Sequence, residues 1–445
     1  MTDEGVGETA VRPLPQSLAI VLLCQIVLTA CQPAPAGVPA PTQSPSAQPT
    51  EITREVLTPT LAPTLTETPA APTPTPTPNP VLAMAISYIR MMDASNGWAK
   101  GQVGLIEPWH GSTHILRTTN GGRTWRDASP PRQEEYGLPA FFLDAQQAWA
   151  WDREGHVLWR TRDGGQSWTR VEGGVWGDAV WFNDDQHGWR FGGEAYGMSF
   201  PGYNINYFET TQDGGRTWNE MAPPPGQGGW PFPAFPDDLT AWMVRAGHRA
   251  ATEGQANLSV PIGVYTTFDG GSTWLSRMLP LPAEAFTVDI QHEGIFLGGV
   301  GNCDFASPVY SSIAIWKLAL TCEDQSWMYT TANQGKTWII SPMPAGLDAA
   351  IRFISPTIGW SFHPDPLDYY GGGLHQTSNG GQSWNLLAAI DYRISQLDFL
   401  DAHTGWAVAE LPCTSDDCPG HSTEVLAKTS DGGRTWQILN PQLEP

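Results

Sequence analysis

The sequence predicts an all-β chain, a seven-bladed β-propeller built from four-stranded antiparallel blades. Three observations predict it. An eight-residue phrase, Thr-x-Asp/Asn-x-Gly-x-Ser/Thr-Trp, occurs seven times, a second phrase centred on Gly-Trp alternates with it, and a short apolar segment precedes most copies of the second phrase. Each repeat therefore offers four strands, and seven such units make a propeller.

The first phrase predicts a structured turn, here called the repeat turn. Asp and Asn accept hydrogen bonds from nearby backbone N–H groups, Gly supplies positive φ, and the Trp starts the return strand as a packing anchor. The turn position is held by Asn120, Asp163, Asp213, Asp269, Asn333, Asn379 and Asp431. The Trp positions are Trp125, Trp168, Trp218, Trp274, Trp338, Trp384 and Trp436. Seven equivalent carboxyl or amide groups cannot form one active site, so we expect a structural role.

The second phrase predicts the strand that precedes each repeat turn in its blade. We name the four strands of a blade A (the apolar lead), B (Gly-Trp), C (into the repeat turn) and D (out of it). The B-strand Trp residues are Trp98, Trp149, Trp189, Trp242, Trp360 and Trp406, and the fifth copy is degenerate, with Ile295 expected at that position. The pattern starts on an A strand and ends on a D strand, which leaves open how the ring closes.

The spacing of the two phrases predicts which face carries the variable loops. The interval from a turn Trp to the next B strand is nearly constant, 24 residues after Trp125 and 22 after Trp384, whereas that from a B strand to its own turn Trp runs from 19 to 43. The variation lies in the B–C connection, on the face opposite the repeat turns. We expect binding there. The insertions are 106–114, 194–208, 245–263, 301–327, 363–373 and 410–424, with the D–A loop 226–235 beside them.

The N-terminal part predicts export and tethering. The apolar run Leu18–Cys31 is short for a membrane span, which takes about 20 residues. It ends in Leu-Thr-Ala-Cys and resembles a bacterial lipobox, which implies a signal peptide over 1–31, lipidation at Cys31 and a location on the outer face of the cytoplasmic membrane. An uncleaved anchor is the alternative. Residues 32–80 are rich in Pro and Thr and predict a disordered linker, so the propeller is expected over 81–445.

The cysteine residues and the net charge further limit the covalent links and the partners that we expect for this chain. Four cysteines follow the linker: Cys303, Cys322, Cys413 and Cys418. Of the three pairings, proximity favours Cys303–Cys322 and Cys413–Cys418 as disulfides; a zinc site is the alternative, but paired C-x-x-C spacing is absent. The formal net charge of −22 argues against nucleic acid as a partner.

The two phrases together resemble the bacterial neuraminidase repeat, or Asp-box, propellers, and they look most like the photosystem II assembly and stability factor-like family. The resemblance covers roughly 83–436. It implies a seven-bladed propeller and, for the assembly-factor branch, binding to membrane protein partners. Asp boxes also occur in sialidases, some endoglucanases and sorting receptors, so the motif specifies the fold more than the function.

Enzymatic readings depend on charged residues of the insertion face. A sialidase needs an arginine triad; Arg245, Arg249, Arg352 and Arg393 are candidates, but the family's Arg-Ile-Pro signature is absent. A glycosidase needs two carboxylates. The candidates are Glu194, Asp304, Glu323, Asp324, Asp365, Asp368, Asp416 and Asp417. His110 and His114 have no helix or Glu to complete a zinc site, and we expect no metal and no cofactor.

Exposed aromatic residues among Gly and Pro suggest a binding surface for a protein or a glycan. They are Trp109, Trp176, Tyr203, Trp230, Tyr369 and Tyr370. Local packing under long loops is the competing interpretation. The sequence thus predicts a monomeric, membrane-tethered, extracytoplasmic module that binds a membrane or envelope protein without catalysis. The alternative is a carbohydrate-binding or glycoside hydrolase (sialidase-like) propeller.

Overall fold

The computed structural model describes most of the chain after residue 83. The described residues are 84–104, 113–131, 138–152, 157–172, 179–192, 207–224, 233–245, 263–280, 282, 303–305, 310–312, 314–322, 325–344, 350–365, 367–412 and 422–444. The chain divides into two compact units, Met1–Pro76 and Thr77–Pro445. The first unit lies outside the described residues, so the predicted signal, lipidation site and most of the linker stay predictions.

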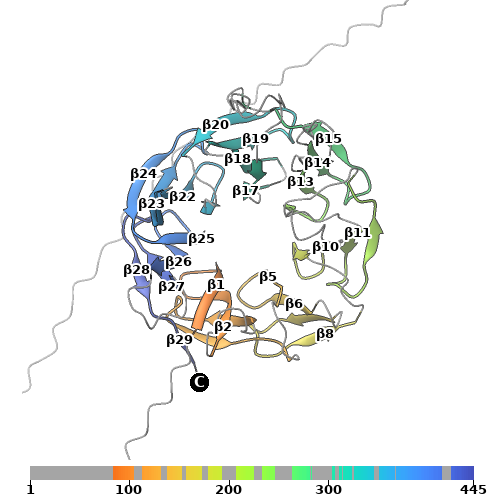
Figure 1. Cartoon of the computed structure of the whole chain (residues 1–445). Coiled ribbons are helices and arrows are strands. Elements are labelled where there is room, and N and C mark those ends of the chain that lie inside the picture. The colour runs from red at the N-terminus through yellow and green to blue at the C-terminus, as the bar shows by residue number, and fades with distance from the viewer. Residues whose placement is uncertain are drawn as a thin grey trace, which may run out of the picture. The chain divides into compact units, whose positions relative to one another are not determined.

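The second unit is the predicted seven-bladed propeller, with the blades arranged around a central axis (Figure 1). All regular elements in the described part are strands. Blade 1 holds β1 (Met84–Met91), β2 (Gly97–Val103), β3 (Thr113–Thr118) and β4 (Thr124–Asp127). Blade 2 holds β5 (Ala140–Phe142), β6 (Ala148–Asp152), β7 (Val157–Thr161) and β8 (Thr169–Val171). Blade 3 holds β9 (Ala179–Phe182), β10 (Gly188–Gly192), β11 (Tyr207–Thr211) and β12 (Asn219–Met221).

The remaining blades follow the same antiparallel order. Blade 4 holds β13 (Ala241–Arg245), β14 (Gly263–Thr267) and β15 (Leu275–Met278), and a single bridge from Ala234 to Trp242 stands for its A strand. Blade 5 holds β16 (Cys303–Phe305), β17 (Tyr310–Ser311), β18 (Trp316–Cys322), β19 (Gln325–Thr331) and β20 (Ile339–Met343). Blade 6 holds β21 (Ala350–Phe353), β22 (Gly359–Asp365), β23 (Asp368–Thr377) and β24 (Asn385–Ile390). Blade 7 holds β25 (Arg393–Phe399), β26 (Gly405–Pro412), β27 (Ser422–Thr429) and β28 (Gln437–Leu439).

The B-strand Trp side chains form the core between blades. Each is fully buried, and five of them stack on an aromatic ring of the next blade: Trp98 on Phe142, Trp149 on Phe182, Trp189 on Phe235, Trp242 on Trp316 and Trp360 on Phe399. Stacked aromatic pairs add to the burial of their large apolar area. The repeated Trp is therefore the unit that joins neighbouring blades.

The four Asp repeat turns share one hydrogen-bond pattern, shown by blade 2, and the three Asn turns differ from it in the side-chain bond to the Ser or Thr hydroxyl. Asp163 Oδ1 accepts from the Ser167 N–H at 2.9 Å and from the Thr161 hydroxyl at 2.8 Å, and its Oδ2 accepts from the Ser167 hydroxyl at 2.5 Å. Two Gly residues with φ of 73° and 79° complete the turn. The Asp therefore stabilises the turn, because both of its carboxylate oxygens already accept hydrogen bonds within it.

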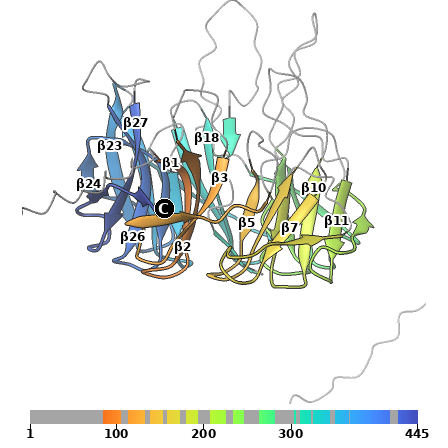
Figure 2. The ribbon, with the colours of Figure 1, turned by 90° about the horizontal axis from the view of Figure 1, so that it is seen from below.

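The A–B loops lie against the repeat turns, as the predicted strand alternation requires. In six blades the N–H after the Asp or Asn donates to an A–B loop carbonyl, for example Gly121 to Ser95 and Gly432 to His403, each at 2.8 Å. The A–B loops also carry an Asx turn that the sequence analysis missed, in which Asp93, Asp144, Asp184, Asp237 and Asp401 accept backbone N–H groups. Both loop types therefore share one face, seen at the lower side of Figure 2.

The C-terminus closes the ring. The short strand β29 (Gln442–Leu443) pairs in parallel with β4, at the outer edge of blade 1. On the inner side, the Gln396 amide donates to the Ile89 carbonyl and accepts from its N–H, and Asp398 accepts from the Met91 N–H. These contacts join blades 7 and 1 without a shared blade, an arrangement that the alternating phrases did not show.

Blade 5 corrects one prediction. The strand beside β19 is β18, so the B-strand position belongs to 316–322 and not to the segment around Ile295, which lies outside the described residues. The segment 301–327 was expected to be a B–C loop, but it contains β16 and β17, which both pair with β18. The degenerate phrase misled the assignment because the Gly-Trp signal is absent from the true B strand.

Candidate functional site

Most of the aromatic binding candidates cannot be placed. Trp109, Trp176, Tyr203 and Trp230 lie outside the described residues, as do Cys413 and Cys418. Tyr369 and Tyr370 lie in β23, next to the β22–β23 turn at the end of blade 6 opposite the repeat turns. Cys303 and Cys322 stand directly opposite each other in the β16–β18 ladder, which is the register that a cross-strand disulfide requires.

The charged candidates do not come together as one catalytic group. Arg352 reaches Asp398 at 3.2 Å, Arg245 lies in β13 and Arg393 in β25, while Arg249 lies outside the described residues. Asp304 lies in β16, and Asp365 and Asp368 flank the β22–β23 turn. Glu194, Glu323, Asp324, Asp416, Asp417 and His110 also lie outside. The His114 ring contacts Asp127 at 2.7 Å, and the described residues contain no group of three metal-ligating side chains.

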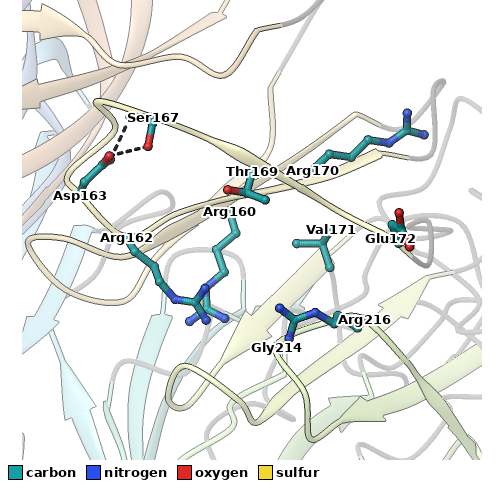
Figure 3. A pocket seen from close by; sticks show the side chains of 10 residues that line it. All are labelled: Arg160, Arg162, Asp163, Ser167, Thr169, Arg170, Val171, Glu172, Gly214 and Arg216. Carbon is teal, nitrogen blue, oxygen red and sulfur yellow. Dashed lines mark hydrogen bonds between the residues drawn. The ribbon is translucent and has the colours of Figure 1, made fainter.

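A pocket of about 340 Å³ lies between the repeat turns of blades 2 and 3 (Figure 3). It is lined by Arg160, Arg162, Asp163, Ser167, Thr169, Arg170, Val171, Glu172, Gly214 and Arg216. Four arginines and two acidic residues thus line one pocket in a chain whose net charge is −22. The strand β8 and the turn before β12 supply its two walls.

Arg160 forms the inner wall of this pocket, here called the arginine pocket. Its side chain is buried, lies over the Trp149 ring at 4.5 Å and donates to Gln147 at 2.9 Å. Asp185 lies 3.6 Å from it. Burial, with the charge of Arg162, lowers the pKa of Arg160 to about 10, which leaves the group charged at neutral pH. These contacts fix its position before any ligand arrives.

The other arginines are more exposed. Arg162 shares Asp185 at 3.9 Å, and Arg216 donates to the Asp213 carbonyl at 3.2 Å. In Figure 3 the guanidinium groups of Arg160 and Arg162 lie close together, whereas Arg170 extends away from them. Several guanidinium groups around one cavity favour carboxylate or phosphate oxygens, which they bind through paired N–H donors.

Asp163, one of the two acidic residues that line the arginine pocket, is unsuited to acid catalysis. Hydrogen bonds from the Ser167 hydroxyl and N–H lower the pKa of Asp163 to about 2, so it is ionised at neutral pH. Both of its oxygens already accept protein hydrogen bonds. A general acid needs a pKa near the working pH. The pocket therefore offers anion binding rather than proton transfer.

The sequence analysis missed this pocket because it placed binding on the opposite face. The signal was present as Arg residues within and on both sides of the phrase in blade 2, at 160, 162 and 170. Sequence spacing alone did not show that blade 3 would add Arg216 to the same cavity. The prediction for the insertion face itself stays a prediction, since most of its loops lie outside the described residues.

Comparisons with known proteins add the fold and little else. No family model and no curated protein sequence matches the chain. Among solved structures, the chain is similar to YCF48 bound to D1 peptide, at 16% identity and a TM-score of 0.38, over 70% of this chain and 86% of that one. It is similar to YCF48 from Cyanidioschyzon merolae at 15% identity and a TM-score of 0.34, over 82% and 87%. A GH74 xyloglucanase from Xanthomonas campestris matches at 14% and 0.30, over 80% and 72%.

These likenesses span binding proteins and hydrolases, so they leave the function open. Within the described residues, no helix is long and apolar enough to cross a membrane.

Proposed function

We propose that the chain is a membrane-tethered, extracytoplasmic propeller that binds a protein partner without catalysing a reaction. The arginine pocket carries the proposal. It gathers four arginines in a strongly acidic chain, and its own contacts hold Arg160 in place. The ligand with matching chemistry is a carboxylate-rich segment of the partner, since side-chain carboxylates accept the paired N–H donors of arginine.

The test is peptide binding to the full chain. We expect a fluorescent hexaglutamate peptide to bind and hexaglutamine not to bind, with an affinity that falls as salt rises. Arg162→Gln with Arg216→Gln should weaken binding about tenfold or more, because two charge-assisted hydrogen-bonding groups are lost. Arg434→Gln is the matched control, since Arg434 donates to the Asp431 carbonyl in blade 7 as Arg216 does to Asp213 in blade 3. Equal binding by both variants would remove the pocket from the proposal.

Tethering is tested separately. The Leu18–Cys31 segment supports lipidation at Cys31, so a labelled fatty acid should enter the wild-type chain in cells and not Cys31→Ser. Incorporation into both chains would contradict the lipoprotein proposal and leave the uncleaved anchor. The glycoside hydrolase alternative needs a general acid, and Asp163 of the arginine pocket does not supply one because it is ionised at neutral pH. Release of reducing sugar from a glycan by the full chain would support that alternative.

A further inference from the structure

The outer edge of blade 1 shows how this propeller takes up an extra strand. The Gln442 N–H donates to the Arg123 carbonyl at 3.1 Å, and the Glu444 N–H donates to the Trp125 carbonyl at 2.7 Å. The Thr124 hydroxyl donates to the Glu444 carboxylate. Leu443 packs beside Trp125, which is completely buried. The strand β29 is thus held by its backbone, one apolar side chain and one carboxylate.

The Thr124 hydroxyl is available for Glu444 because blade 1 has Asn, not Asp, in its repeat turn. The Thr124 N–H donates to Asn120 Oδ1, which places the Asn120 amide nitrogen on the Thr124 hydroxyl oxygen, at 2.8 Å. The Thr124 hydroxyl oxygen then accepts a hydrogen bond from the Asn120 amide, and its own proton can be donated to another group. In the Asp turns the direction is reversed: the Ser167, Thr217, Thr273 and Thr435 hydroxyls each donate to an Asp Oδ2.

Blades 5 and 6 repeat the arrangement of blade 1 without a strand on it. Asn333 donates to the Thr337 hydroxyl and Asn379 to the Ser383 hydroxyl, each at 2.8 Å. Both hydroxyls are exposed, and among the described residues no group accepts their protons. The carbonyls that correspond to those of Arg123 and Trp125 are at 336 and 338 in blade 5, and at 382 and 384 in blade 6.

The edges of these two blades also differ from those of the Asp blades. Their outer strands, β20 and β24, have five and six residues, longer than the other outer strands, and each is the last strand of its sheet (Figure 1). Ile339 is 54% exposed and Leu386 is 64% exposed. Leu275 and Met278 in β15 of blade 4 are comparably exposed, at 45% and 58%, so strand length is what distinguishes the two edges. Long edge strands with exposed apolar side chains invite pairing with another strand.

The Trp residues of these turns are incompletely satisfied. Trp125 under β29 is fully buried, whereas Trp338 and Trp384 are half-buried, like the turn Trp residues of the Asp blades, so the state of the indole N–H is what sets these two apart. Their buried indole N–H groups have no hydrogen-bond partner, while the other five turn Trp residues all donate to a carbonyl. Both blades therefore have free hydroxyl donors, long apolar edges and incompletely covered Trp side chains.

We propose that the outer edges of blades 5 and 6 are docking edges for an extended segment of a protein partner. The segment adds as a parallel strand to β20 or β24 and places a carboxylate on the Thr337 or Ser383 hydroxyl, as β29 does on blade 1. Its matching pattern is an apolar residue followed by Asp or Glu, as in Leu443–Glu444. These edges are separate from the arginine pocket, and the proposal does not rest on it.

The probe is a peptide copy of residues 440–445, added to the full chain. Hydrogen exchange should slow in the segments containing β20 and β24, and a peptide with Glu444→Gln should bind about tenfold more weakly, because a hydrogen bond to a charged group is lost. In the chain, Asn333→Asp with Asn379→Asp should abolish this protection. The substitution should keep the turn geometry found in the Asp blades. The Thr337 and Ser383 hydroxyls would then donate to the new Asp carboxylates instead of to the peptide, and each Asp adds a negative charge.

Asn219→Asp is the control, since it adds a negative charge to the outer strand of blade 3 and leaves the repeat turn unchanged. It should bind like the wild type. Protection confined to β4 would mean that the peptide only replaces the chain's own β29, and it would overturn the proposal. Protection that persists in the double Asn→Asp chain, or no protection at all, would overturn it as well. Hexaglutamate lacks the apolar residue and reports on the arginine pocket alone.

Discussion

Blade 5 and blade 7 solve the same packing problem with different side chains. In blade 7, Trp406 Nε1 donates to the Gly121 carbonyl of blade 1 at 3.0 Å. In blade 5, the residue at this position of the ladder is Lys317, and its Nζ donates to the Gly380 carbonyl of blade 6 at 2.7 Å. Each acceptor is the first residue after the Asn of the next blade's repeat turn. Blades 5 and 7 therefore share the bond to that carbonyl, although different residues make it.

The aromatic side chain of blade 5 has moved by one residue. Trp316 stands opposite Thr331, where blade 7 has Gly405 opposite Thr429. Because side chains alternate between the faces of a strand, this shift turns Trp316 toward the preceding blade, where it stacks on Trp242 at 5.0 Å. The face toward blade 6 is left to Lys317, whose ammonium lies 5.1 Å from the Phe353 ring.

The largest expected effect is loss of the Trp contact in a regular blade. Trp406→Ala should lower the free energy of unfolding by about 4 kcal/mol, since it removes a fully buried indole and its hydrogen bond across the ring closure. Lys317→Ala should cost about 2 kcal/mol, because the bond is lost but so is a buried charge. Guanidinium titration of both variants measures the difference. A cost for Lys317→Ala below about 0.5 kcal/mol, typical of surface sites, would show that the Lys does not replace the Trp.

The second largest effect is expected from the predicted disulfide of blade 5. Cys303 and Cys322 face each other across the ladder of blade 5, at the Cα separation of about 4.5–5.5 Å that antiparallel partners have and a disulfide tolerates. Replacing both by Ser should lower the free energy of unfolding by about 3 kcal/mol under oxidising conditions. A reducing agent should lower the wild-type chain to the same level and leave the variant unchanged. Two reactive thiols at these positions in the unreduced chain would contradict the pairing.

The same two blades show how far the sequence determines the fold. Blade 7 was predictable, since Trp406, Asp431 and Trp436 stand at the expected positions and the strands follow. Blade 5 was not predictable, because the B strand is identified by Gly-Trp. In blade 5 Lys317 makes the contact with the next blade, and a Lys gives no such signal. The closure of the ring by β29 could not be predicted either, since a strand of two residues is too short to show a periodic pattern. The arginine pocket depends on residues from two blades, which local motifs cannot place together.

The stability of the chain should also depend on pH through Lys317 of blade 5. Burial lowers the pKa of Lys317 to about 8, below its value of 10.5 in the unfolded chain. Between these values the unfolded chain binds more protons than the folded one, so stability rises with pH from about 8 to about 10. Below about 8 the cost of burying the charge is fully present. Lys317→Met should reduce this rise, and the part due to Lys428 of blade 7, whose pKa is also lowered by burial, should remain. A rise of the same size in the variant would assign it to other groups.

The smallest expected effect concerns the repeat turn of blade 5. Gln334 has a φ of 61° where the other six turns have Gly with φ between 72° and 78°. A non-Gly residue in the left-handed region destabilises the folded state by about 1 kcal/mol. Replacing it with Gly removes this strain, but Gly loses more conformational entropy on folding, which offsets part of the gain. Gln334→Gly should therefore raise the free energy of unfolding by about 0.5 kcal/mol. The bond from Arg277 to the carbonyl of residue 334, at 2.7 Å, involves the backbone and should persist.

The reverse change in blade 7 sharpens that test. At Gly432 a Cβ would stand 2.5 Å from the Ala402 carbonyl oxygen, so Gly432→Gln must shift the A–B loop as well as strain the turn. We expect it to cost more than 1 kcal/mol. Thermal denaturation of the two variants and the wild type measures both changes in stability. A loss of stability in Gln334→Gly would mean that the Gln side chain supports blade 5, as Lys317 does, and that the blade tolerates its departures from the repeat because each one makes a compensating contact.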